Sequence, residues 1–247
     1  MSANQNLFRL ECKKAKRTGF GPAFLAGAVL AAAFPVIQMA ARTELFLSVR
    51  KTPVAILLNA NWQLMSMLNI LLAVAGACLL YHTEYADHAI LKMQMLPIQE
   101  SSLYAAKVLL LVDMCLVALM IEATAVFLCV LYWFPGADPM HALAETGKHF
   151  GVSFLLLLPA VLLSLGIASA FENMWISLGI GVICVFTATL LPPDVWILSL
   201  FPYALPFQII SGLSGSAVRN YLLAGAAEVL VVYAAETLFL NIRKSRS

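Results

Sequence analysis

The stretch VAILLNANWQLMSMLNILLAVAGACLLY, residues 54–81, carries no charged side chain from its first residue to its last. A hydrocarbon core about 30 Å thick needs roughly 20 apolar residues in a helix that rises about 1.5 Å per residue. The stretch exceeds that length, and further apolar runs follow along the chain. Segments of about ten residues with alternating polarity, which a membrane barrel requires, are not visible. The pattern therefore predicts an all-α integral membrane protein.

Composition supports the same class of protein. Of the 247 residues, 62% are hydrophobic and 11% are charged, whereas soluble domains carry about 25% charged residues. The net charge of +2 is too small for a nucleic-acid-binding protein, so we expect no nucleic-acid partner. The five cysteines form no CxxC pair and four of them lie in apolar runs. They are therefore expected to be small buried side chains, and neither a disulfide framework nor a metal site is predicted.

We expect six transmembrane helices in a single transmembrane domain that covers residues 1–247. Their approximate ranges are 20–39, 54–81, 103–133, 149–171, 174–191 and 221–242. Pro35 predicts a kink in the first span. Six spans return both termini to one side of the membrane, and ten of the 15 Lys and Arg residues then lie on that side. The positive-inside rule therefore predicts that both termini are cytosolic.

Residues 5–18 mix apolar and basic side chains, which predicts an N-terminal helix that lies on an anionic membrane surface. The residues expected at the membrane interface are Lys13, Lys14, Lys16 and Arg17. Positive-inside flanking charge next to the first span explains the same residues, and both interpretations can hold together.

Residues 191–220 are expected to form a long outer connection between the fifth and sixth spans. Its four prolines rule out a straight span, while its apolar stretches are too hydrophobic for a solvated loop. Short re-entrant or interfacial helices, buried against the rest of the protein, satisfy both observations.

Residues 82–96 interrupt the apolar sequence with a helical pattern. Apolar residues recur at steps of three and four, and charged residues gather on the other side. Pro97 ends this helix because it has no backbone N–H to donate, and Lys107 lies one turn into the third span, close enough to the interface to snorkel. The pattern predicts a short amphipathic helix parallel to the membrane, and a simple interfacial helix fits it equally well.

Four acids lie within the expected spans, and two of them, Asp113 and Glu236, fall toward cytosolic ends where water is close. Glu122 and Glu228 lie deeper, where an acid exposed to lipid costs roughly 2.5–3.5 kcal/mol. These two are candidates for a translocation path, a subunit contact or a substrate contact, and an interhelical hydrogen bond is at least an equal alternative.

Sequence motifs of catalysis are otherwise missing. HExxH, GxSxG and the phosphate-binding GxxxxGK[ST] do not occur, so a membrane enzyme is disfavoured. If ATP drives this protein, the ATPase is another subunit.

Two segments resemble the membrane subunits of ABC-2 type ABC transporters, in their lantibiotic-immunity branch. LFRLECKKAKRT resembles the start of these permeases, and TEYADHAILKMQMLPIQESSLYAAKVLLL resembles the region after their second span. The matching positions in the first segment are Glu11, Lys13, Lys16 and Arg17. Those in the second segment are Glu84, Leu91, Leu96, Pro97, Ile98, Tyr104 and Lys107.

The resemblance implies that residues 82–96 form a coupling helix that seats in a groove of a cytosolic ATPase. The residues expected to couple to the ATPase are Glu84, Asp87, His88, Leu91, Lys92 and Pro97. It also implies a multi-pass protein of the bacterial cell membrane, with an ABC ATPase dimer, a second identical or related permease and membrane lipid as partners. ATP and Mg²⁺ would belong to the ATPase, and no cofactor or metal is expected in this chain.

The same branch implies a cargo of amphipathic lantibiotic-type antimicrobial peptides, which are expelled from the membrane for self-protection or resistance. An ABC-2 exporter of another cargo, such as a drug, a lipid or another peptide, is the alternative within this class. A polytopic membrane enzyme and a non-transporting sensor are the alternatives from other classes.

Overall fold

The computed structural model describes residues 3–86, 100–191, 195–209 and 213–246, and within these ranges the chain is helical with no strand. The long helices are α2 (Phe20–Leu47), α3 (Pro53–Ala86), α5 (Glu100–Trp133), α6 (Pro139–Ala170) and α9 (Gly215–Arg246). The shorter elements are α1 (Ala3–Arg17), α7 (Met174–Leu190), α8 (Trp196–Ser199) and the 3-10 helix η1 (Leu205–Phe207).

Five of these helices, α2, α3, α5, α6 and α9, are long and apolar enough to cross a membrane, among the residues described. The prediction of an all-helical, multi-pass membrane protein is therefore confirmed. The expected fifth span corresponds to α7, whose 17 residues rise by roughly 26 Å. This is slightly less than the thickness of a typical hydrocarbon core, so the six-span arrangement stays a prediction.

Several helices extend beyond the ranges expected from hydropathy. The helix α6 begins ten residues before the expected fourth span, because the Asp138 side chain accepts a hydrogen bond from the Met140 backbone N–H at 3.1 Å and caps the helix. The helix α2 continues to Leu47 and has non-helical backbone angles at Arg42. We expected the kink at Pro35, so the observed interruption lies seven residues later in the sequence. Hydropathy locates the membrane-length part of a helix, whereas capping residues locate its ends.

The end of α3 also differs from the expectation. We expected the second span to stop at Tyr81 and a separate helix to begin at His82, but α3 continues without a break to Ala86. Residues 82–86 therefore belong to α3, and the remainder of the expected coupling helix, 87–96, lies outside the described residues.

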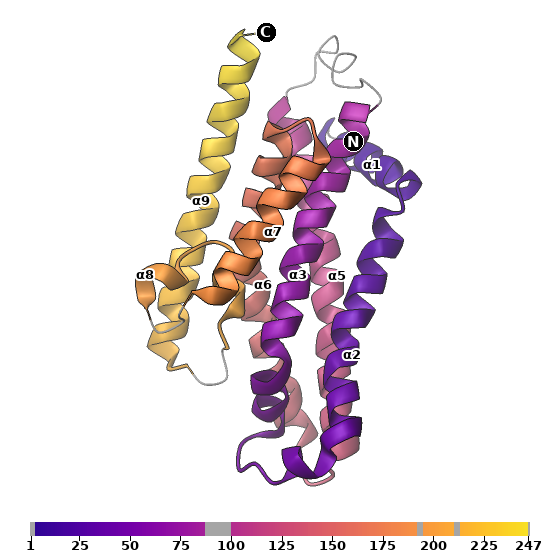
Figure 1. Cartoon of the computed structure of the whole chain (residues 1–247), viewed down its shortest axis with the longest axis vertical. Coiled ribbons are helices and arrows are strands. Elements are labelled where there is room, and N and C mark those ends of the chain that lie inside the picture. The colour runs from indigo at the N-terminus through magenta and orange to yellow at the C-terminus, as the bar shows by residue number, and fades with distance from the viewer. Residues whose placement is uncertain (1–2, 87–99, 192–194, 210–212, 247) are drawn as a thin grey trace.

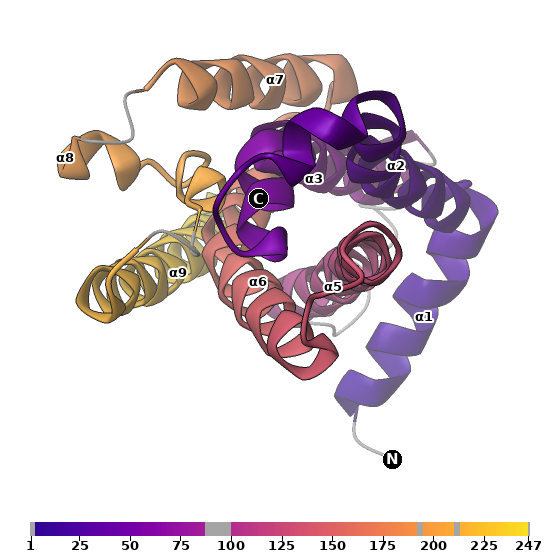
Figure 2. The same ribbon diagram turned by 90° about the horizontal axis from the view of Figure 1, so that it is seen from below.

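The helices α2, α3, α5 and α6 pack against one another as the central bundle, while α7 packs on α3 and α9 packs on α6. Figure 1 shows the start of α1 and the end of α9 at the same end of this bundle, where α3 ends and α5 begins. Seen from below, α1 lies across the bundle axis beside α5, and α7 and α9 lie on the outside (Figure 2). The central helices thus form the core that positions the polar sites.

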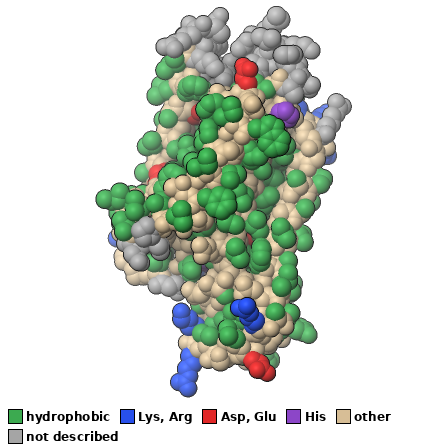
Figure 3. Space-filling model, viewed as in Figure 1, with side chains coloured by type: hydrophobic (Ala, Val, Ile, Leu, Met, Phe, Trp, Pro, Cys, Tyr) green, Lys and Arg blue, Asp and Glu red, His purple; other side chains and the backbone are tan. Residues whose placement is uncertain are grey.

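The surface has the character expected of a protein surrounded by lipid. Apolar side chains are spread over the whole length of the face in Figure 3, and most charged side chains on it lie near the ends of the bundle. Exposed apolar residues are especially dense on α9, where they include Leu223, Leu230, Val231, Leu238 and Phe239. In a soluble protein such a surface would be an aggregation hazard, whereas in a bilayer it is the lipid-facing surface.

Candidate functional site

A buried ion pair joins the N-terminal helix to the bundle. The Lys107 Nζ atom, near the start of α5, donates a hydrogen bond to Glu11 Oε2 of α1 at 2.8 Å, and both side chains are 1% exposed. Lys14 donates to the other carboxylate oxygen at 2.8 Å. The Lys107 ammonium also lies 5.2 Å from the centroid of the Tyr81 ring on α3, within cation–π range. One lysine thus links α1, α3 and α5.

This geometry corrects the expectation that Lys107 snorkels to the membrane surface. The Lys107 side chain is 1% exposed. Its ammonium group points into the protein because the buried Glu11 carboxylate lies next to it. Buried charges are tolerated when they are paired and hydrogen-bonded, and here the pair is supplied by two helices that are far apart in the sequence.

Electrostatics keeps Glu11 ionised in this position. Burial raises the pKa of the Glu11 carboxyl, but the neighbouring Lys107 and Lys14 ammonium groups lower it further, so the pKa lies below its ordinary value of 4.5. The pair therefore stabilises the docked position of α1 fully above about pH 4.5.

We expect acid to release this contact. As pH falls through the lowered pKa of Glu11, the carboxyl binds a proton and leaves the Lys107 ammonium buried without its counter-charge. Thermal unfolding of the detergent-solubilised chain, followed from neutral pH to well below pH 4.5, should show a loss of stability that Glu11→Gln does not share. Parallel pH profiles for the two proteins would contradict this role.

The predicted interfacial residues of α1 divide into two groups. Lys13 and Lys16 are exposed, which leaves their ammonium groups available to lipid headgroups. Lys14 is partly buried by its bond to Glu11, and the side chain of Arg17 lies outside the described part of the structure.

Most of the residues expected to couple to an ATPase are likewise outside the described residues. These are Asp87, His88, Leu91, Lys92 and Pro97. Glu84 lies in the last turn of α3, and its side chain is not described. The end of α3 and the start of α5, which flank these residues in the sequence, lie at the same end of the bundle as α1 (Figure 1).

The two deep acids occupy different environments. Glu122 on α5 is 0% exposed and accepts a hydrogen bond from Asn69 Nδ2 of α3 at 3.0 Å. Glu122 therefore makes the interhelical hydrogen bond that was the alternative to a functional role, and its side chain lies inside the helix bundle of this chain. Glu228 on α9 is partly exposed, and one of its oxygens is buried without a hydrogen-bond partner. Among the described interactions, no hydrogen bond or ion pair joins Glu122 to Glu228.

The two acids expected near cytosolic ends also differ from each other. Asp113 on α5 is exposed, whereas Glu236 on α9 is buried and accepts a hydrogen bond from the Ser169 hydroxyl of α6. Glu236 therefore fastens α9 to the central bundle. No sequence pattern indicates this partner, because a serine in an apolar run belongs to no distinctive motif.

The proline-rich connection is packed into the bundle for part of its length. Tyr203 and Leu205 are 0% exposed, and the Tyr203 hydroxyl lies 3.0 Å from the Ser164 hydroxyl of α6. The Pro206 carbonyl accepts hydrogen bonds from Trp62 Nε1 at 3.0 Å and Ser66 Oγ at 2.9 Å, both on α3. The expected short helices are represented by α8 and η1, and their re-entrant path through a membrane stays a prediction.

Comparison with known families identifies the class of this membrane protein. The model of the family described as "ABC-2 family transporter protein" matches residues 7–188. The chain belongs to the ABC-2 transporter family. This match covers most of α1, the four central helices and nearly all of α7. No curated protein and no solved structure matches the chain.

Membership of the ABC-2 family makes this chain a membrane permease of an ABC transporter, and the family implies an ABC ATPase as a general partner. Two of the polar contacts described above can now be located within a permease. The buried pair Glu11–Lys107 lies at the end where α3 and α5 flank the expected coupling segment, and residues 201–208 pack against α3 and α6 further along the bundle.

Proposed function

We propose that this ABC-2 permease works in an ATP-driven exporter that removes lantibiotic-type antimicrobial peptides from the bacterial cell membrane and expels them outward. The observation that carries the proposal is the Glu11–Lys107 pair. Each partner lies in one of the two segments that resemble the lantibiotic-immunity branch, and the pair joins those segments into one unit. A drug, a lipid or another peptide is the alternative cargo.

The proposed complex contains two copies of an ABC ATPase, which hold ATP and Mg²⁺, and a second permease that is identical or related to this chain. Both termini face the cytosol. This orientation is supported by the excess of Lys and Arg on the side of the termini and by the position of the start of α1 and the end of α9 at one end of the bundle.

Coupling runs through residues 82–96. When the ATPase closes, this segment moves and carries the start of α5 with it. Lys107 then moves α1 through the buried bond to Glu11, and it stays in contact with Tyr81 of α3. Because such a buried pair is costly to separate, the three helices shift together. The peptide enters between α2, α3 and α7, and residues 191–220 shape the outer exit.

The test reverses charge in the expected coupling segment. Glu84→Arg and Asp87→Arg should weaken co-purification of the ATPase, or should separate ATP hydrolysis from peptide resistance in cells, because charged rims set the register of such interfaces. Glu44→Arg, an exposed acid near the far end of α2, is the matched control and should behave like the parent.

Two experimental outcomes test the coupling segment and the cargo separately. Unchanged ATPase binding and unchanged resistance in both variants would refute the assignment of the coupling segment. Stimulation of ATP hydrolysis by a drug or lipid, with no response to a lantibiotic peptide, would replace the proposed cargo and keep the transporter.

A further inference from the structure

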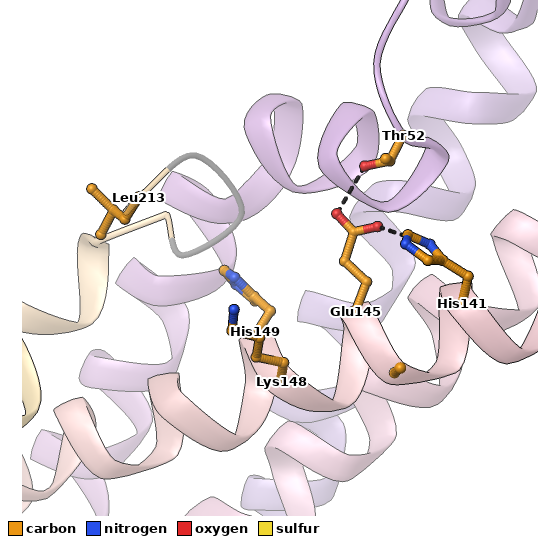
Figure 4. Close-up of a pocket in the computed structure, with 7 residues that line it drawn as sticks. Thr52, His141, Glu145, Lys148, His149 and Leu213 are labelled. Carbon is orange, nitrogen blue, oxygen red and sulfur yellow. Dashed lines mark hydrogen bonds and ion pairs between the residues drawn. The ribbon is translucent and has the colours of Figure 1, made fainter. Parts of the chain in front are cut away.

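The helices α3 and α6 are tied together near both of their ends. In the last turn of α3, the Tyr85 hydroxyl donates a hydrogen bond to the Ser169 backbone carbonyl of α6 at 2.7 Å. Near the starts of the two helices, Thr52 Oγ1 donates to Glu145 Oε1 at 2.8 Å (Figure 4). Because the helices also pack against each other between these bonds, α3 and α6 form one stiff unit.

Ser169 extends this connection to α9. Its carbonyl accepts from Tyr85, while its hydroxyl donates a hydrogen bond to the Glu236 carboxyl of α9. Ser169 is 0% exposed and Glu236 is 8% exposed, so the bond lies inside the protein. Gly166, one turn before Ser169, leaves room for the carboxyl, since a Cβ atom there would lie 3.0 Å from Glu236 Oε2. One residue of α6 thus joins the end of α3 to α9.

The start of α5 also reaches α9. The Tyr104 hydroxyl of α5 donates a hydrogen bond to the Leu162 carbonyl of α6 at 3.4 Å. The Tyr104 ring lies 5.9 Å from the Tyr233 ring of α9, measured between centroids. Tyr233 and Glu236 are three residues apart and therefore lie on one side of α9. The two helices that flank residues 87–99 in the sequence, α3 and α5, thus both connect to the same turn of α9.

The other end of α9 contacts the proline-rich connection. Val218 and Tyr221 form a small buried cluster with Leu156 of α6 and Leu205 of η1, and the Tyr221 hydroxyl donates to Ser199 Oγ of α8 at 3.4 Å. Between its ends α9 is mostly exposed, with 11% of its most apolar stretch buried. The helix is therefore held by a polar contact at one end and by the connection at the other.

We propose that α9 is a lever, and that Tyr85, Ser169 and Glu236 are positioning residues that pass movement of the end of α3 to α9. The lever then moves α8 and η1 through the contacts at its other end. This role rests on the proposed function, because the ATPase is taken as the source of the movement. It does not follow from the family match, which ends at residue 188, before α9 begins.

The test measures the distance between α6 and α9 in the full chain, purified with its ATPase and placed in lipid nanodiscs. Spin labels are attached at Leu155→Cys and Leu238→Cys, which are exposed positions of α6 and α9. Cys12→Ser and Cys184→Ser leave only buried native cysteines. We expect ATP and Mg²⁺, trapped with vanadate, to shift the distance between the labels. The lever would be wrong if the parent shows no shift.

Two substitutions remove the bond between α6 and α9 from either side. Ser169→Ala removes the donor and keeps the backbone carbonyl that Tyr85 uses, and Glu236→Leu removes the acceptor. Each should abolish the shift caused by ATP, although the ATPase still co-purifies and hydrolyses ATP. Glu236→Gln keeps a carbonyl oxygen that can accept from Ser169, so it should retain most of the shift. A full shift in both Ser169→Ala and Glu236→Leu would overturn the assignment.

Gly166→Ala tests the same bond without changing either of its partners. Alanine favours a helix more than glycine does, so the substitution does not weaken α6, but its methyl group crowds Glu236 Oε2. The shift should therefore decrease. Gly151→Ala, on the same helix, is the matched control, because a Cβ atom there meets nothing within 4 Å. An equal, parent-like shift in the two alanine variants would contradict the role of the Glu236 carboxyl.

The outcomes distinguish the lever from the proposed function. If Glu84→Arg and Asp87→Arg lose the ATPase while Ser169→Ala keeps the shift, the coupling segment stands and the lever is wrong. If the charge-reversed variants keep both the ATPase and the shift while Ser169→Ala loses the shift, the lever stands and the coupling segment is wrong. No peptide is added in this measurement, so its result does not depend on the cargo.

Discussion

Lys107→Met lowers the free energy of unfolding by about 3–5 kcal/mol if the buried pair holds α1 as the structure indicates. Methionine has a similar length and fits an apolar site, so the change removes the ammonium with little loss of packing. The Glu11 carboxylate then stays buried with only the partly exposed Lys14 as a partner. Thermal unfolding in detergent measures the loss of stability.

Release of α1 gives a second readout. Cys12, next to Glu11 and partly buried, should react faster with a maleimide in Lys107→Met, in a Cys184→Ser background that removes the other partly buried cysteine. The cysteines on α3 and α5 are buried and should stay protected. Lys13→Met, at an exposed position of the same helix, is the matched control and should change neither stability nor labelling.

The double variant Glu11→Gln/Lys107→Met distinguishes an ion pair from a general packing effect. Replacing both charges leaves no buried unpaired charge, so most of the stability should return. Additive losses in the double variant would show that the two residues act independently, and the proposed link between α1 and α5 would then be wrong.

Trp62→Ala is expected to cost about 3–5 kcal/mol, the range for removing a fully buried large aromatic side chain. Trp62 is 1% exposed, donates a hydrogen bond to the Pro206 carbonyl and contacts both His149 and Phe150. The substitution therefore opens a cavity at the α3–α6 interface and loosens residues 201–208 at the same time. Limited proteolysis should cut this connection faster in the variant, alongside a lower unfolding temperature.

A tryptophan elsewhere in the chain provides the comparison. Trp175 on α7 is 71% exposed, so Trp175→Ala removes little buried surface and should leave both measurements close to the parent. Trp62→Phe keeps most of the apolar volume and loses the N–H donor, so it should fall between the parent and Trp62→Ala. Equal stability of Trp62→Ala and Trp175→Ala would contradict the packing role of the connection.

The helices themselves were largely predictable. The short α7 was expected at 174–191 and is found at Met174–Leu190, because Asn173 caps its start and the apolar run stops where prolines begin. The start of α6 was missed by ten residues, since its first turns carry His141, Glu145 and Lys148. Polar residues are compatible with a helix outside the hydrocarbon core, and hydropathy cannot tell such a helix from a loop.

The candidate site was predictable in composition but only partly in geometry. Glu122 could be singled out from the sequence as an acid deep in an expected span, but its partner Asn69 lies on another helix.

Apolar run length and charge placement thus establish that this chain is helical, crosses a membrane several times and carries a polar segment after its second span. They report the cost of placing each segment in lipid, one segment at a time. Which side chains meet is a different question. Lys107 could have reached water or a partner, and only the packing of α1 across α5 brings Glu11 to it over 96 residues of sequence. Because transfer free energy carries no information about which helix faces which, that pairing has to come from the folded arrangement.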